Sequence, residues 1–199
     1  MFNFEEYQKI QKNIDFLGKK TKIVAISKNH PLEEIQSAIS CGLEVFGENR
    51  VQEAKFKFDD IKKRNSKIKL HLTGPLQSNK VKQALDLFDV FHTLDREKLL
   101  KEFVKFPEKI KNKSFFIQVN TGKEITKSGV LPEDTRYFLD LCQKYGLNNI
   151  DGLMCIPPIN DSPKKHFQII NELTKECGVG RPSIGMSSDY EQALHFDPK

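Results

Sequence analysis

The sequence has few cysteines, and none of them pairs in a recognisable motif. Its four cysteines, Cys41, Cys142, Cys155 and Cys177, lie far apart, without a CxxC pair or a histidine-rich neighbourhood. This spacing argues against a zinc site and against a disulfide scaffold. We therefore expect buried or idle thiols and no metal ligands.

Long hydrophobic runs are also absent. No stretch approaches the roughly 18 apolar residues that a membrane helix needs. The first 20 residues lack the apolar core of a signal peptide and carry Glu5 and Glu6 early. Apolar residues recur there at helical spacing, which predicts an amphipathic first helix: Phe4, Tyr7, Ile10, Ile14 and Leu17. The sequence predicts a cytoplasmic protein without a membrane partner.

The positive charge has no nucleic-acid motif attached to it. The net charge is +5, and the most basic run covers residues 62–69. This run contains no aromatic residue to stack on bases and matches no recognition motif. It spans the end of a predicted helix, where lysines favour the helix dipole. We expect a solvated surface and no specific nucleic-acid partner.

No Ser/Gly linker or composition break divides the chain, so residues 1–199 are predicted to form a single domain. Short apolar runs alternate with helical patterns throughout. The predicted strands are 22–28, 43–47, 68–73, 89–93, 115–120, 150–156 and 183–186. The predicted helices between them lie near 32–41, 50–63, 77–88, 96–105, 133–145, 164–176 and 188–195. This alternation predicts an α/β fold with parallel strands and right-handed crossovers.

An open doubly wound sheet and a closed barrel both fit this alternation. A doubly wound sheet that binds a dinucleotide would carry a glycine-rich loop after an early strand, but Gly178–Arg181 precedes a strand instead. Polar or special residues follow nearly every predicted strand, as on the rim of a TIM-like (β/α) barrel. We expect such a barrel, although it should have eight strands and only seven units are found.

Lys28 is the first candidate for a functional residue. It closes the apolar run 22–28 and precedes a helical pattern, and α/β folds keep reactive groups at that position. A desolvated lysine can lose its proton and attack a carbonyl to form a Schiff base. The alternative is a strand-end lysine that points into water.

Three further rim segments carry candidate ligand groups. Asn49 follows the second strand, and either faces a ligand or caps the next helix together with Gln52. His71 and Thr73 share one face of their strand, with His71 deeper in the barrel if that face is the interior. A buried histidine is more often a hydrogen-bonded core residue than a catalyst.

The segment around Ser187 and Ser188 leads from the last strand into the last helix. Ser188 and Glu191 form a capping-box pattern, and the backbone N–H groups of both serines would be available to an anion. An ordinary capped helix is the alternative to a phosphate site. An aldehyde that bears a phosphate would satisfy both Lys28 and these serines, and pyridoxal 5′-phosphate (PLP) is such a molecule.

Six motifs now identify a family. The ordered runs IVAISK, VFGENRVQEA, HLTGPLQSNK, IQVNTGKEITKSG, GLMCIPP and SIGMSSDYEQA, within residues 20–195, closely resemble the pyridoxal phosphate homeostasis proteins. That family is similar to the barrel domain of bacterial alanine racemase. The resemblance implies that Lys28 carries PLP as a Schiff base. It also implies that Asn49 and His71 line the cofactor face, and that Met186 and Ser187, with Ser188, hold the phosphate.

The resemblance implies a non-catalytic PLP carrier, without catalytic residues, that serves vitamin B6 and amino-acid homeostasis. PLP-dependent apoenzymes are the expected partners, and a monomer or weak dimer is the expected state. Family members usually continue into a final strand with an Arg-Ile-Gly-Thr-like run, which this sequence lacks. We therefore expect a missing eighth strand and either weak PLP binding or closure of the barrel by another segment or chain.

A PLP-dependent racemase-like enzyme is the alternative. A two-base racemase needs a second acid or base on the opposite face of the cofactor. In the racemases that the chain resembles, a tyrosine from a separate C-terminal domain supplies it. The four tyrosines, Tyr7, Tyr137, Tyr145 and Tyr190, fall in helical patterns. Only a weak side activity is therefore expected.

Overall fold

The computed structural model describes residues 2–198, and these contain one parallel sheet with strand order β1-β2-β3-β4-β5-β6. The strands are β1 (Ala25–Ile26), β2 (Val45–Glu48), β3 (Lys69–Leu72), β4 (Val90–Leu94), β5 (Ser114–Gln118) and β6 (Ile150–Met154). The α-helices are α1 (Phe4–Phe16), α2 (Leu32–Ser40), α3 (Val51–Arg64), α4 (Val81–Leu87), α5 (Glu97–Phe103), α6 (Pro107–Ile110), α7 (Thr135–Lys144), α8 (Pro163–Cys177) and α9 (Tyr190–Leu194). Two short 3₁₀ helices, η1 (Ser78–Lys80) and η2 (Pro132–Asp134), precede α4 and α7.

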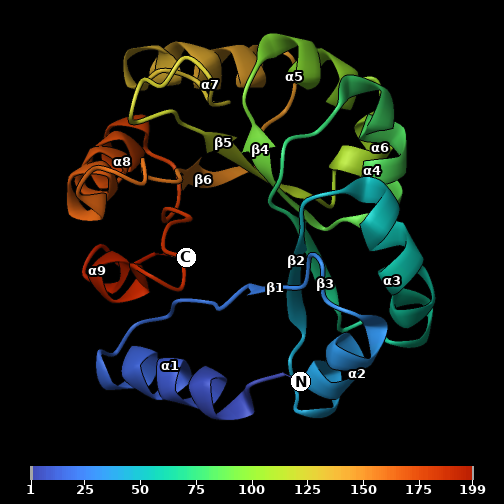
Figure 1. The fold of residues 1–199 in the computed structure, drawn as a ribbon. Coiled ribbons are helices and arrows are strands. Elements are labelled where there is room, and N and C mark those ends of the chain that lie inside the picture. Colours follow the sequence, from blue (N-terminus) through green and yellow to red (C-terminus); the bar gives the residue numbers. More distant parts are fainter. Residues whose placement is uncertain (1, 199) are drawn as a thin grey trace.

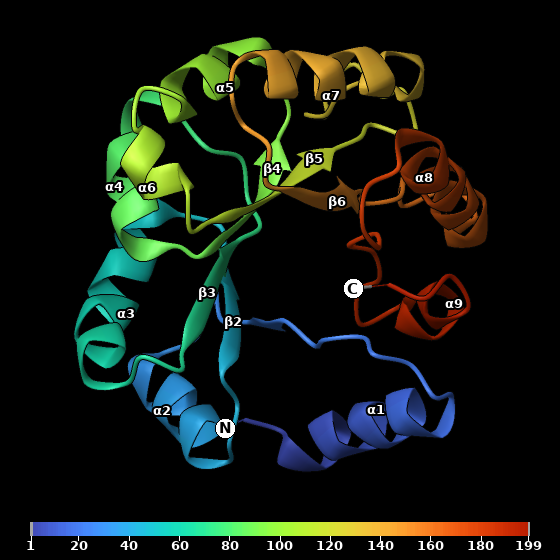
Figure 2. The same ribbon diagram turned by 180° about the vertical axis from the view of Figure 1, so that it is seen from behind.

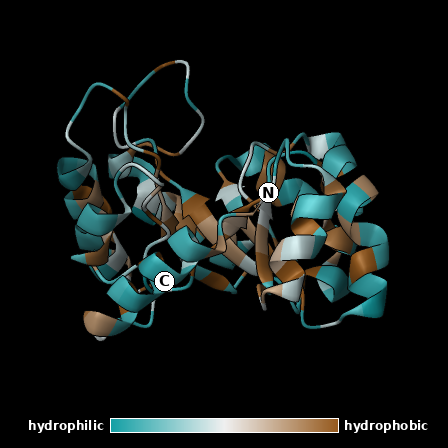
Figure 3. Cartoon of the chain, turned by 60° about the horizontal axis from the view of Figure 1, so that its bottom comes forward, coloured by the Kyte–Doolittle hydropathy of each residue, from teal (hydrophilic) through white to brown (hydrophobic). Residues whose placement is uncertain are grey.

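The parallel α/β architecture predicted from the alternation is confirmed. Figures 1 and 2 show the helices surrounding the sheet. Each strand pairs with the strand that follows it in the chain. Figure 3 shows apolar residues gathered on the strands and hydrophilic residues on the outer sides of the helices. Such strands read as continuous apolar runs in the sequence because both of their faces are covered.

The prediction of seven strands is wrong, because the described residues contain six. The segment 183–186 forms only an isolated bridge between Ser183 and Met154. Pro182 has no N–H to donate to a ladder, and Gly185 turns the chain away with φ +95°. The first strand is also shorter than predicted, with two residues in place of 22–28.

The strand register separates two faces of the sheet. Phe46 pairs with Leu70, and both side chains are buried against the helices. Gly47 pairs with His71 on the opposite, inner face. Side chains alternate along a strand, so Thr73 lies on the same inner face as His71. This placement of His71 and Thr73 agrees with the sequence prediction.

Side-chain and backbone contacts bridge the edge between β1 and the Ser183 segment. The Arg181 guanidinium donates to the carbonyl of Lys20 at 3.2 Å, and the Thr21 hydroxyl donates to the carbonyl of Pro198 at 2.8 Å. The Asp197 carboxylate lies 3.8 Å from the ammonium of Lys19. We call these contacts the seam. Figure 2 shows α9 and the end of the chain between α8 and α1.

None of the helices in residues 2–198 combines the length and the apolar character that crossing a bilayer requires.

The thiols differ sharply in accessibility. Cys41 is exposed, while Cys142, Cys155 and Cys177 are buried, and all four are free. Burial raises the pKa of both Cys142 and Cys155 to about 12. Since the thiolate is the reactive form, we expect a disulfide reagent to modify Cys41 alone in the native protein and all four thiols after denaturation. A spectrophotometric thiol count checks this. Rapid native modification of Cys142 or Cys155 would contradict it.

Candidate cofactor site

Lys28 lies in the turn that follows β1. Ser27 is buried, Lys28 is exposed, and Asn29 has a left-handed conformation with φ 62°. The sequence predicted that Lys28 closes strand 22–28 and left open whether its side chain is desolvated or points into water; the strand ends at Ile26 and the side chain is exposed. The residue nevertheless lies at the carboxyl end of the sheet. Within the described residues the Lys28 ammonium forms no hydrogen bond or ion pair, so it is available to a ligand.

A buried ionic cluster anchors this turn. The Lys57 ammonium donates to Glu48 Oε1 at 3.1 Å and to Glu53 Oε1 at 2.6 Å. It also donates to the carbonyl of Ser27 at 2.8 Å, and the Ser27 hydroxyl donates to Glu48 Oε1 at 2.7 Å. The sequence analysis missed Lys57 and Glu53, although their i,i+4 spacing on a helix was a visible signal.

The two carboxylates of this cluster have pKa shifts of opposite sign. Desolvation raises the pKa of Glu48, which is fully buried, and the hydrogen bonds from Ser27 and Lys57 only partly oppose the rise. The hydrogen bond from Lys57 lowers the pKa of Glu53, and the N–H of Asn29 lowers it further. Oε2 of Glu48 is buried and has no hydrogen-bond partner among the described residues.

The raised pKa of Glu48 gives a pH-dependent stability. The folded state holds the Glu48 proton more tightly than the unfolded state, whose carboxyl titrates near its ordinary value of about 4.3. The stability that this tighter proton binding gives the folded state is fully present below the unfolded-state pKa and is lost as the pH rises through the raised pKa of Glu48. We expect Glu48→Gln to gain stability relative to the native chain between mildly acidic and mildly alkaline pH. Urea unfolding of both proteins at the two pH values checks this. The same change in the free energy of unfolding with pH in both proteins would contradict it.

Asn49 presents an unpaired amide oxygen at the rim. Helix α3 begins at Val51 with Arg50 as its N-cap and no side-chain capping bond, so of the two alternatives for Asn49 the helix cap is wrong. Oδ1 of Asn49 is buried and lacks a partner in the described part of the chain. Gly74 packs directly on this residue, since a Cβ at Gly74 would lie 2.6 Å from the Asn49 carbonyl oxygen. A buried, unsatisfied acceptor at a rim is what a ligand donor would satisfy.

His71 belongs to a hydrogen-bonded chain across the inner face. Its Nδ1 lies 2.9 Å from Nε2 of His92, and Nδ1 of His92 lies 2.9 Å from the hydroxyl of Ser183. The His92 ring also stacks on Phe116 with a centroid distance of 4.7 Å. The sequence analysis did not select His92, because a histidine in an apolar strand resembles a core residue. This chain links β3 to the Ser183 segment.

The turn before α9 carries the predicted phosphate residues. The helix begins at Tyr190, and the carboxylate of Asp189 accepts from the N–H of Met186 at 2.6 Å. The capping box of Ser188 with Glu191 is therefore wrong. Among the described residues, the N–H groups of Ser187 and Ser188 find no acceptor, and Met186 is 45% exposed.

The structure brings the predicted residues to one end of the sheet from two sides. Lys28, Asn49 and His71 follow or lie on the neighbouring strands β1, β2 and β3. A Cβ at Gly47 would lie 2.6 Å from Cδ1 of Ile26 and 3.4 Å from Cγ2 of Thr73, so these strands share a crowded inner face. Met186, Ser187 and Ser188 approach from beyond β6, where Ser183 bridges Met154.

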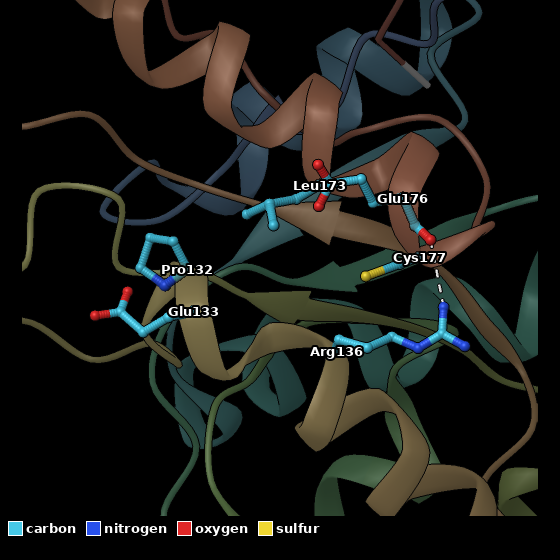
Figure 4. A pocket seen from close by; sticks show the side chains of 6 residues that line it. All are labelled: Pro132, Glu133, Arg136, Leu173, Glu176 and Cys177. Atoms are coloured by element: carbon cyan, nitrogen blue, oxygen red, sulfur yellow. Dashed lines mark hydrogen bonds between the residues drawn. The ribbon is translucent and has the colours of Figure 1, made fainter.

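A separate cavity lies in the helical layer, away from these residues. Its volume is about 530 Å³, and it opens between η2, α7 and the last turn of α8. Figure 4 shows its lining, in which the Arg136 guanidinium donates to the carbonyl of Glu176 at 3.3 Å. None of the predicted cofactor residues lines it.

Comparison with known proteins agrees with this arrangement. The sequence profile of the family "Alanine racemase, N-terminal domain" matches residues 6–197. The pyridoxal phosphate homeostasis protein of Aquifex aeolicus is 35% identical over 202 residues, covering 94% of this chain and 87% of that protein.

Solved structures extend the similarity to the fold. PipY of Synechococcus elongatus without PLP superimposes with a TM-score of 0.84 at 28% identity, covering 98% of this chain and 94% of PipY. The structure of PipY with PLP bound gives a TM-score of 0.76 at 30% identity, covering 90% of this chain and 88% of the PipY chain. The chain therefore belongs to the pyridoxal phosphate homeostasis protein family, which has the fold of the alanine racemase N-terminal domain.

Proposed function

We propose that this chain is a non-catalytic PLP-binding protein that holds the cofactor on Lys28 and serves PLP and amino-acid homeostasis in the cytoplasm. The observation that carries the proposal is the unpaired amine of Lys28 on an anchored turn at the carboxyl end of the sheet. Relatives of this chain are named for pyridoxal phosphate homeostasis, and PipY binds PLP in a solved structure.

The residues present fit the chemistry of PLP. The neutral amine of Lys28 would add to the aldehyde carbon, form a carbon–nitrogen double bond and release the aldehyde oxygen as water. Asn49 offers a buried oxygen without a partner, which suits a hydroxyl donor. The N–H groups of Ser187 and Ser188 suit a phosphate, with Met186 beside them. PLP itself would supply an electron sink when bound.

His71 contributes to this proposal through the inner face. Its hydrogen bond to His92 fixes the orientation of its ring beneath the rim. Ser183 holds His92 from the other side, so the hydrogen bonds span the inner face from β3 to the Ser183 segment beside β6. We propose that this pair lines the lower surface of the cofactor pocket.

The carrier proposal is favoured over a racemase-like enzyme by the positions of the tyrosines. Tyr7, Tyr137 and Tyr190 lie in helices α1, α7 and α9, and Tyr145 directly follows α7. None of them lies at the carboxyl end of a strand, where the candidate cofactor residues gather. We therefore assign no catalytic residue.

Two further expectations remain part of the proposal. PLP-dependent apoenzymes are the expected recipients, and a monomer or weak dimer is the expected state. The described residues join β1 to the Ser183 segment through the seam contacts, and we propose that side-chain contacts of this kind leave the phosphate side of the site loose.

An absorbance titration of the purified protein with PLP tests the function. We expect a saturable yellow band and, after borohydride reduction, a single labelled peptide that contains Lys28. Labelling spread over many surface lysines without a saturable band would contradict the proposal. A parallel assay of alanine racemisation tests the alternative, which would be supported by turnover that depends on bound PLP.

A further inference from the structure

We infer that Glu48, Glu53 and Lys57 form a positioning cluster that fixes the turn carrying Lys28, so that its amine is presented to an aldehyde. The inference rests on the proposed function, because it assigns a role in PLP attachment to residues that do not touch the cofactor. These three side chains come from β2 and α3, not from the turn itself.

The cluster binds the backbone on both sides of Lys28. On the preceding side, the Lys57 ammonium donates to the carbonyl of Ser27 at 2.8 Å. On the following side, Glu53 Oε1 accepts from the N–H of Asn29 at 2.7 Å. Lys57 joins these two contacts, since it lies 2.6 Å from the same Glu53 oxygen. The turn is therefore clamped on both sides of Lys28, whose ammonium forms no hydrogen bond or ion pair within the described residues.

The side chain of Ser27 adds a second link to the cluster. Its hydroxyl donates to Glu48 Oε1 at 2.7 Å, and its N–H donates to the carbonyl of Gly47 at 2.9 Å. Asn29 is held in a left-handed conformation, which is unfavourable for most residues other than glycine and tolerated by asparagine. Contacts from the cluster hold this conformation in place.

Burial of the cluster has no evident benefit for the core alone. Glu48 is fully buried with one oxygen unpaired, and Lys57 is 8% exposed. Well-packed apolar residues often match or exceed the stability of a buried ion cluster. A role in fixing the geometry of the turn explains why three ionisable side chains are kept at this place. A reactive group displaced by about 1 Å can lose about 100-fold in reactivity.

Lys57→Met is the principal test, since it removes the shared donor and keeps the apolar stem. We expect apparent PLP affinity and borohydride-trapped label on Lys28 to fall at least about tenfold. Pyridoxine 5′-phosphate has an alcohol in place of the aldehyde and cannot condense with an amine. Its binding, measured by calorimetry, should be unchanged, because the ring and phosphate contacts do not involve the cluster.

Lys62→Met is the matched control. Lys62 lies on the same helix and pairs with Asp89 at 2.5 Å, at the opposite end of the strands from the turn. We expect it to lower thermal stability without changing PLP attachment. Lys57→Arg, which can donate to the same acceptors, should restore part of the trapped label. Glu53→Gln, at a partly exposed position, is the substitute test if Lys57→Met does not fold. We expect it to lower the borohydride-trapped label on Lys28 by less than Lys28→Ala does.

The outcomes separate the possible failures. Full attachment on Lys28 in both Lys57→Met and Glu53→Gln would overturn the inference while leaving the proposed function intact. Equal losses for PLP and pyridoxine 5′-phosphate, together with a lower unfolding temperature, would show a merely structural role and overturn it as well. Absence of label on Lys28 in the native chain would overturn the proposed function itself.

Discussion

Replacing Lys28 with alanine is expected to abolish saturable PLP attachment. The residue is exposed in its turn, and its amine forms no hydrogen bond or ion pair with the described residues, so its loss should leave folding intact. Attachment should fall at least about 100-fold, because nucleophilic addition has no second amine on this turn. Absorbance titration and peptide mapping after borohydride reduction measure the effect.

Two substitutions sharpen this prediction. Lys28→Arg keeps a positive charge at this position but cannot condense, since a guanidinium stays protonated. Lys22→Ala removes an exposed lysine before β1 and should change nothing. Lys113 is the competing amine to examine, because burial lowers its pKa. It lies at the amino end of β5, opposite the turn that carries Lys28. A saturable band in Lys28→Ala that maps to Lys113 would refute the assignment.

Phe115→Ala is expected to cause the largest loss of stability. The Phe115 side chain is fully buried, with ring centroids 5.2 Å from Phe91 and 4.9 Å from Phe103. Removing such a ring loses its transfer free energy and leaves a cavity between β4, β5 and α5. The free energy of unfolding should fall by about 3–5 kcal/mol.

Phe56→Ala is the matched control for this core substitution. Phe56 lies on α3 and is 85% exposed, so its removal should change stability by no more than about 0.5 kcal/mol. Urea unfolding with unchanged m-values would assign both effects to the folded state. Similar midpoints for the two variants would contradict the described burial.

The sequence was informative where the physical signal is local. Buried parallel strands read as apolar runs, and six of seven predicted strands therefore exist in the described residues. The seventh failed because Pro182 and Gly185 disrupt pairing, which an apolar pattern does not show. Helix α6 was missed because its four residues are too few for a periodic pattern.

The site was less predictable, because its geometry depends on contacts between distant residues. Lys57 reaches a carbonyl 30 residues earlier in the chain, and no local spacing indicates that contact. Asn49 and Ser188 carry capping patterns that the structure does not use, and a pattern alone cannot tell a cap from a free polar group. The role of His92 is visible only in the structure, where it lies within hydrogen-bonding distance of both His71 and Ser183.

The order of the strands has a consequence for how the chain acquires its fold. Each strand pairs with its sequence neighbour, so the sheet can grow from β1 to β6 with short loop closures as the polypeptide emerges from the ribosome. The hydrogen bonds of the seam join residues 161 and 177 positions apart, and its ion pair joins Lys19 to Asp197, so the seam has a high closure entropy. We expect it to form last during synthesis, and we expect the backbone amides of the segments that it joins to exchange ahead of those of the central strands.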